Sequence, residues 1–153
     1  MAAELRTFVD IEASPERVWD VLTDVPAMPE WNPFVVQAEG TFAVGERLSL
    51  RLPRLASVFR VTLRPTVLEA TPHRRLRFRM HLAWPGIPGL FDSEQTLTIT
   101  PQDGGVRLWE QAEFSGLLVP LLTRSLNRDR SQAFDEMNAA LKARIEGRSP
   151  GPG

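Results

Sequence analysis

The strongest constraint on the fold is the alternation of apolar and polar residues in the segment 74–82, RRLRFRMHL, which is strict from Arg75 onward. The apolar side chains share one parity: Leu76, Phe78, Met80 and Leu82. Because successive side chains of a β-strand point to opposite sides, a period of two predicts a strand with one buried and one solvated face. One-sided burial is typical of antiparallel sheets. The pattern therefore predicts an antiparallel sheet that is covered on one side.

Six further segments have strand character, either by alternation or as apolar runs between turn signals. They are residues 5–11, 34–40, 46–52, 57–70, 91–100 and 106–114. Pro65 interrupts the fourth segment, which predicts an edge position or a bulge within that long strand. The last two segments flank Asp103, Gly104 and Gly105, which favour a tight hairpin. We expect about seven strands.

Two helices are predicted at opposite ends of this run of strands. Ser14 is a favourable N-cap, Pro15 suits the first helical position, and Glu16 complements the helix dipole. A long C-terminal helix is expected from Leu118 to Ile145, followed by a disordered tail over 147–153. Strands grouped apart from helices indicate an α+β domain, which we place at residues 1–146.

The composition excludes several classes of function. Eighteen Lys and Arg residues nearly balance nineteen Asp and Glu residues, so we expect no nucleic-acid partner. Without cysteine there is no disulfide or thiolate site, and His73 and His81 do not form a metal-binding motif. With no signal peptide and no membrane-spanning run, we expect a cytoplasmic protein without stable membrane insertion. No cofactor motif is found, and both a monomer and a homodimer stay open.

Two segments carry a resemblance to a known superfamily. Residues 13–35, ASPERVWDVLTDVPAMPEWNPFV, and residues 134–146, FDEMNAALKARIE, resemble the START-like (SRPBCC) superfamily, most closely its bacterial polyketide cyclase/dehydrase and lipid-transport branch. The resemblance covers about residues 3–146. It implies a helix-grip fold, in which a curved antiparallel sheet of about seven strands surrounds the long C-terminal helix. It also implies a cavity for lipids, polyketides or similar ligands, in a superfamily of enzymes, carriers and sensors.

One carboxylate stands out on the last predicted strand. If its even-numbered residues face inward, Glu110 interrupts an apolar row, and Ser93 and Gln95 are the inward polar residues of the neighbouring strand. A carboxylate in an apolar cavity is suited to proton transfer because its charged form is disfavoured. A register slip of one residue would instead place Trp109 inside and Glu110 in water.

Three other features allow both a functional and a structural interpretation. Trp31, between Pro29 and Pro33, could gate a cavity or fill the core. Arg130, in the polar stretch 127–132 of the long helix, could anchor a ligand or extend its head to solvent. The apolar loop over 82–91 could form a portal or a plug.

The alternating arginines Arg75, Arg77 and Arg79 could bind phosphate, or simply form a solvated face. In the second interpretation, acidic residues on adjacent strands neutralise them: Glu69, Glu94 and Glu113. We adopt this second interpretation, because it needs nothing beyond an ordinary solvated sheet face.

These observations lead to three hypotheses. The leading hypothesis is a carrier or sensor that binds a small hydrophobic molecule between the sheet and the C-terminal helix. The others are a cofactor-free polyketide cyclase or aromatase that uses Glu110 as acid and base, and a non-catalytic interaction module. The predicted ligand-binding residues are Trp31, Phe59, Phe78, Met80, Ser93, Gln95, Leu108, Leu122, Leu126 and Arg130.

Overall fold

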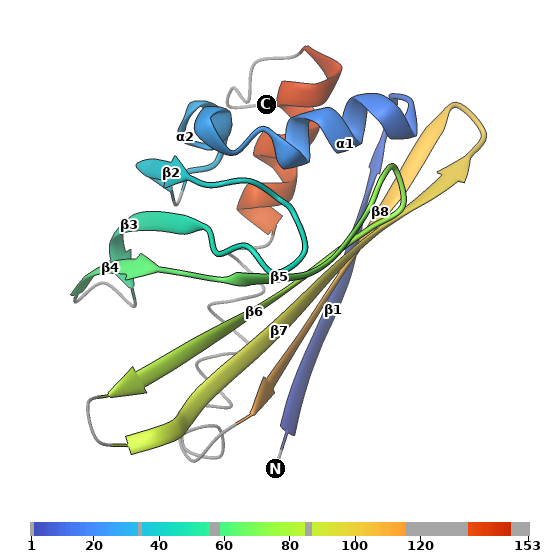
Figure 1. The fold of residues 1–153 in the computed structure, drawn as a ribbon. Coiled ribbons are helices and arrows are strands. Elements are labelled where there is room, and N and C mark those ends of the chain that lie inside the picture. Colours follow the sequence, from blue (N-terminus) through green and yellow to red (C-terminus); the bar gives the residue numbers. More distant parts are fainter. Residues whose placement is uncertain (1, 34, 56–58, 85–86, 116–134, 148–153) are drawn as a thin grey trace.

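The computed structural model describes residues 2–33, 35–55, 59–84, 87–115 and 135–147 (Figure 1). Its elements, in chain order, are β1 (Ala2–Ile11), α1 (Pro15–Thr23), the 3-10 turn η1 (Val25–Ala27), α2 (Met28–Trp31), β2 (Gln37–Glu39), β3 (Ser49–Leu55), β4 (Phe59–Leu63), β5 (Thr66–Thr71), β6 (Arg75–Trp84), β7 (Ile87–Gln102) and β8 (Gly105–Ser115). A C-terminal helix follows over residues 135–146. The chain thus has the α+β, helix-grip architecture that the sequence predicts.

The described strands form two antiparallel sheets. The larger has the order β1-β8-β7-β6-β5, and the smaller has the order β2-β3-β4. A single bridge between Arg47 and Thr66 connects them. The expected strand over 57–70 is therefore two strands in two sheets, β4 and β5, which are separated at Pro65. Proline has no backbone N–H to donate to a sheet, which explains the break at this position.

The hairpin between β7 and β8 fixes which residues of these strands face inward. Gly104 has a φ of 79°, a value that glycine adopts without strain. A Cβ atom at Gly105 would lie 2.1 Å from the carbonyl oxygen of Ile11, so only glycine allows the β1 end to approach this closely. The resulting register pairs Leu97 with Glu110.

Helix α1 begins where the sequence predicts. The Ser14 side chain accepts a hydrogen bond from the backbone N–H of Arg17, and Pro15 is the first helical residue. Val18, Val21 and Leu22 are buried against the sheet. Figure 1 shows α1 and the C-terminal helix on the same side of the five-stranded sheet, and no helix of the described residues lies on its opposite face.

The C-terminal helix closes the main core. Its Leu141 and Ile145 belong to the same buried cluster as Val106 and Leu108 of β8. The predicted helix begins at Leu118, but residues 116–134 lie outside the described part of the chain. No helix of the described residues is both long and apolar enough to span a membrane.

Polar contacts fix the end of this helix to the first strand. Lys142 donates from Nζ to the backbone carbonyl of Asp10. The backbone N–H of Glu12 donates to Glu146 Oε2 at 2.8 Å. Arg144 forms an ion pair with Glu30 of α2 at 3.0 Å. The last turns of the helix are therefore tied to β1 and α2 as well as packed on the core.

Candidate functional site

The inner row of β8 contains one charged residue. Its apolar members are buried: Val106, Leu108, Ala112 and Phe114. Glu110 lies in the middle of this row and is only 1% exposed. Trp109 lies on the opposite face, where its ring is 5.1 Å from that of Phe8 and under the guanidinium of Arg6. The register is therefore the one that points Glu110 inward.

No hydrogen bond from a described residue offsets the burial of the Glu110 carboxyl group. Neither Oε1 nor Oε2 has a hydrogen-bond partner among the described residues. Burial raises the pKa of the Glu110 carboxyl to about 8, and the nearby negative charge of Asp135 contributes in the same direction. A carboxyl group with this pKa exchanges protons near neutral pH, as a general acid or base must.

The C-terminal helix brings a second polar group to the same region. Asn138 is 5% exposed, and its Oδ1 has no partner among the described residues. Leu141 and Ile145 pack with Leu108 and Val106, so the inner face of the helix follows the inner row of β8. One turn before Leu141 this face presents Asn138, and the exposed Asp135, a further turn back, is near enough for its charge to act on Glu110.

Strand β7 places the two other predicted polar residues farther along the inner face. Ser93 is 3% exposed, its hydroxyl has no partner among the described residues, and it lies opposite Phe114. Gln95 is half-buried opposite Ala112, diagonal to Glu110 and within reach of its side chain. Because Leu97 is the residue opposite Glu110, Ser93 is about 13 Å from that level along the strand.

The other predicted ligand-binding residues fall into three groups. Leu108 is buried beside Glu110, and Phe78 and Met80 are half-buried on the inner side of β6. Phe59 lies in β4, with only its backbone described. The remaining three lie outside the described residues: Leu122, Leu126 and Arg130. Their predicted roles are untested.

Trp31 packs between the two halves of the interior. It contacts the main core cluster and also a second cluster, which contains Met28, Val35, Leu48 and Val67 among others. Its indole Nε1 is buried without a hydrogen-bond partner among the described residues. Trp31 thus joins the two sheets at the α2 corner. The apolar segment 82–91, predicted to be a loop, instead continues β6 to Trp84 and begins β7 at Ile87, and residues 85–86 lie outside the described part of the chain.

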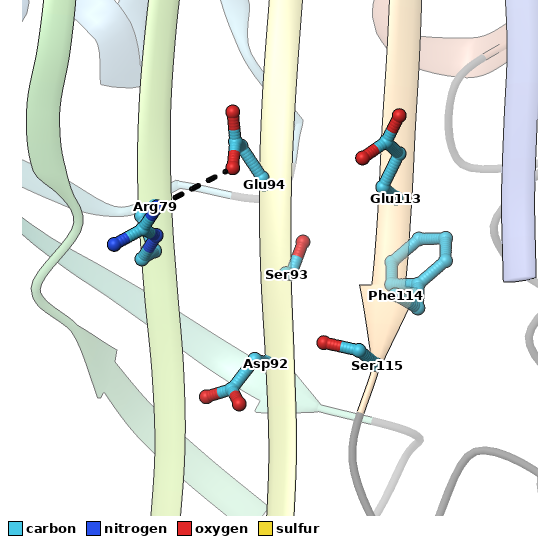
Figure 2. A pocket seen from close by; sticks show the side chains of 7 residues that line it. All are labelled: Arg79, Asp92, Ser93, Glu94, Glu113, Phe114 and Ser115. Carbon is cyan, nitrogen blue, oxygen red and sulfur yellow. Dashed lines mark ion pairs between the residues drawn. The ribbon is translucent and has the colours of Figure 1, made fainter. Parts of the chain in front are cut away.

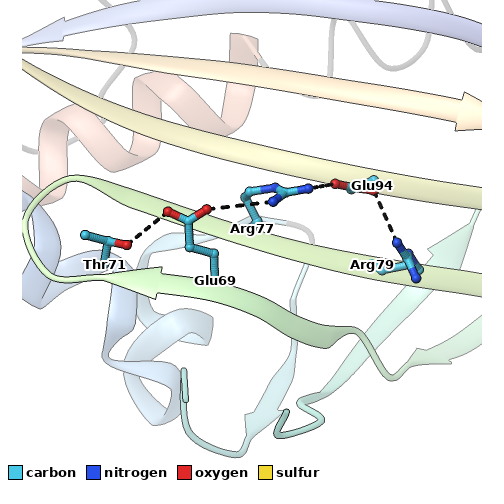
Figure 3. A network of polar contacts seen from close by, with 5 residues as sticks. All are labelled: Glu69, Thr71, Arg77, Arg79 and Glu94. Carbon is cyan, nitrogen blue, oxygen red and sulfur yellow. Dashed lines mark hydrogen bonds and ion pairs between the residues drawn. The ribbon is translucent and has the colours of Figure 1, made fainter. Parts of the chain in front are cut away.

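Two of the three arginines in the β6 row, Arg77 and Arg79, are paired with carboxylates on the solvated face. Arg77 contacts Glu94 and lies 3.7 Å from Glu69, and Arg79 lies 3.5 Å from Glu94 (Figure 3). The hydrogen bond with Arg77 lowers the pKa of Glu94 and raises that of the guanidinium. The expected cross-strand pairing is confirmed for Glu69 and Glu94. It leaves no row of free cations for phosphate on these residues.

An open pocket of about 360 Å³ lies at the end of β8, beside the middle of β6 and the first half of β7 (Figure 2). It is lined by Arg79, Asp92, Ser93, Glu94, Glu113, Phe114 and Ser115. By strand alternation five of these, all except Ser93 and Phe114, belong to the solvated side of the sheet. This polar pocket is therefore distinct from the region around Glu110.

Sequence reasoning missed Asn138 and Asp135. The available signal was the spacing of Asn138, three residues before Leu141, which places a polar group on the apolar face of the helix. No group of three or more His, Asp or Glu side chains within the described ranges is arranged to hold a metal ion.

The chain is similar in sequence to one protein family and in structure to several solved proteins. A family model described as polyketide cyclase / dehydrase and lipid transport matches residues 2–146. No curated protein matched the sequence. A START superfamily protein from Mycobacterium smegmatis is similar in structure, with a TM-score of 0.69 and 18% identity over 94% of this chain and 97% of that one.

Two further solved structures have the same fold. Ara h 8.0201 has a TM-score of 0.75 and 10% identity, over 97% of this chain and 100% of its own. The di-domain ARO/CYC StfQ from the steffimycin biosynthetic pathway has a TM-score of 0.76 and 14% identity, over 95% of this chain and 51% of its own. At these identities the likeness establishes the START-like fold alone. The match of the family model over nearly the whole length shows that the chain belongs to the polyketide cyclase/dehydrase and lipid transport family.

Proposed function

We propose that this domain binds a small, largely apolar molecule between the inner face of the five-stranded sheet and the C-terminal helix, as a carrier or sensor. The observation that carries the proposal is that Ser93 and Glu110 on the inner face of the sheet, and Asn138 on the C-terminal helix, are buried with polar atoms that have no partner among the described residues. Each such atom costs roughly 1–3 kcal/mol of folding stability. A bound molecule with a few polar groups would offset this cost.

The class of ligand follows from the surroundings of these atoms. Leu108, Ala112 and Phe114 supply an apolar wall, which favours an apolar ligand skeleton. The family description, which includes lipid transport, supports the same class. A ligand would therefore bind by shape, with one or two polar anchors.

Native mass spectrometry of freshly purified protein tests the proposal. We expect an apolar small molecule to remain bound under native conditions and to dissociate on denaturation. Gln95→Leu and Thr96→Leu form a matched pair, since these neighbours in β7 point to opposite faces. The first variant should change which molecules are retained, and the second should not. If a panel of fatty acids, sterols and aromatic polyketides never binds, the domain is better described as an interaction module.

A second candidate function is cofactor-free cyclisation or dehydration of a carbonyl-rich chain. It is favoured by the pKa of about 8 at Glu110, because such a group can both donate and accept a proton at neutral pH. Glu110→Gln should then reduce turnover by about 10²–10⁴-fold and preserve substrate binding. Unchanged turnover of a β-polyketone substrate in this variant would exclude Glu110 as the acid or base.

A further inference from the structure

The unpartnered polar atoms around Glu110 are of one chemical kind. Both oxygens of the ionised Glu110 carboxylate and Oδ1 of Asn138 are hydrogen-bond acceptors. All three are buried, and they belong to two elements that pack face to face. Atoms of this kind are satisfied only by donors, so their arrangement carries information about the ligand.

The described residues that face this cluster carry no positive charge. Across the sheet, Thr7 of β1 and Leu97 of β7 lie opposite Glu110 and are uncharged, as is the diagonal neighbour Gln95. On the C-terminal helix, Asp135 adds negative charge near enough to act on Glu110.

The nearest basic residues of the described helix have other partners. Lys142 contacts the Asp10 carbonyl and Glu146, and Arg144 pairs with Glu30. Within the described residues, the cluster is therefore acceptor-rich and has no neutralising cation.

We propose that the ligand of this site is an apolar molecule that carries a protonated amine, which donates hydrogen bonds to Glu110 and Asn138. This inference rests on the proposed function and specifies its ligand class. A primary ammonium group has three N–H donors, which matches the number of these acceptors. A hydroxyl supplies only one donor, and a ketone or ester supplies none.

Binding of such a cation has a defined proton balance. With a pKa of about 8, the free Glu110 carboxyl is mostly protonated at neutral pH. When the ammonium group binds, the carboxyl O–H releases its proton to solvent and the carboxylate pairs with the cation. No covalent bond of the ligand changes. Amine affinity should therefore rise about tenfold between about pH 6 and about pH 7.

Two isosteric probes test this inference. They are 2-(1-naphthyl)ethylamine and 2-(1-naphthyl)ethanol, which share a ring and differ in the donor group. Calorimetric titration in two buffers of different ionisation enthalpy measures both the affinity and the protons released. We expect the amine to bind at least about tenfold more tightly than the alcohol at pH 8, with nearly one proton released at pH 6.

Variants on opposite faces of β8 provide the control. Glu110→Gln should abolish the amine preference and its pH dependence, whereas Glu113→Gln, on the solvated face, should change neither. If Glu110→Gln does not fold, the pH dependence of amine binding by the unmodified protein still tests the proposal.

The possible outcomes separate the two proposals. Equal, pH-independent binding of amine and alcohol, or an amine preference that persists in Glu110→Gln, overturns the amine inference and leaves the proposed function standing. Failure of both probes and of the ligand panel described above overturns both proposals.

Discussion

The burial of Glu110 predicts a specific pH dependence of stability. The folded protein holds the pKa of Glu110 at about 8, against an ordinary value of 4.5. Folding therefore favours the protonated form. The stabilisation relative to the ionised form is fully present below the ordinary pKa and is lost as the pH rises through the folded-state pKa.

The magnitude follows from this difference. A shift from 4.5 to about 8 corresponds to about 5 kcal/mol between the two limits. From about pH 5.5 to about pH 8, this residue should lower the free energy of unfolding by about 3 kcal/mol. Glutamine has nearly the same shape and does not ionise, so Glu110→Gln should lack this loss.

Urea unfolding of both proteins across this pH range measures the effect. All other titratable groups are common to the two proteins, so the difference between their unfolding free energies isolates Glu110. We expect the stability difference in favour of Glu110→Gln to grow by about 3 kcal/mol between about pH 5.5 and about pH 8. Glu113→Gln, which changes an exposed residue of the same strand, should follow the unmodified protein. A difference that stays constant with pH would refute the argument that burial controls the pKa of Glu110.

Three further substitutions test the packing and the backbone. Gly105→Ala should lower the free energy of unfolding by several kcal/mol, because its Cβ would lie 2.1 Å from Ile11 O. A loss of about 0.5 kcal/mol or less, as for an ordinary surface substitution, would contradict the close approach. Leu108→Ala should lower the free energy of unfolding by about 2–5 kcal/mol, because it opens a cavity in the main core. A melting temperature close to that of the unmodified protein would show that this region is loosely packed. Ser14→Ala should cost about 1 kcal/mol through loss of the α1 cap, and Ser14→Asp should restore it if capping is the cause.

The strand pattern was predictable because one face of the sheet is buried. Alternation over β6 identified its inner row, and the Ser14–Pro15 signal located the start of α1. The division at Pro65 was only partly predictable. A proline indicates that pairing is interrupted, but which sheet each half joins depends on contacts distant in sequence, such as the bridge between Arg47 and Thr66.

The candidate site shows the same limit. Local alternation offered Glu110 or Trp109 as the inward residue, and only the pairing with β1 and β7 decides between them. Asn138 was missed because a polar residue on a helix is ordinary until its neighbours Leu141 and Ile145 are known to face the sheet. The lack of a hydrogen-bond partner for Glu110 among the described residues is a property of the tertiary structure, and patterns in a single sequence do not contain it.

The hydrogen bonds between the end of β1 and the end of the C-terminal helix have a consequence for the order of folding. Strand β1 pairs only with β8 in the described structure, and its last residues bond to Lys142 and Glu146, more than 130 positions away. Because synthesis proceeds at about 5–20 residues per second, β8 is made roughly 5–20 s after β1. Closure of such distant contacts slows folding, and an unpaired strand is exposed to other chains meanwhile. Glu4, Arg6 and Asp10 place charges along β1, which protects this strand from association until its partners arrive.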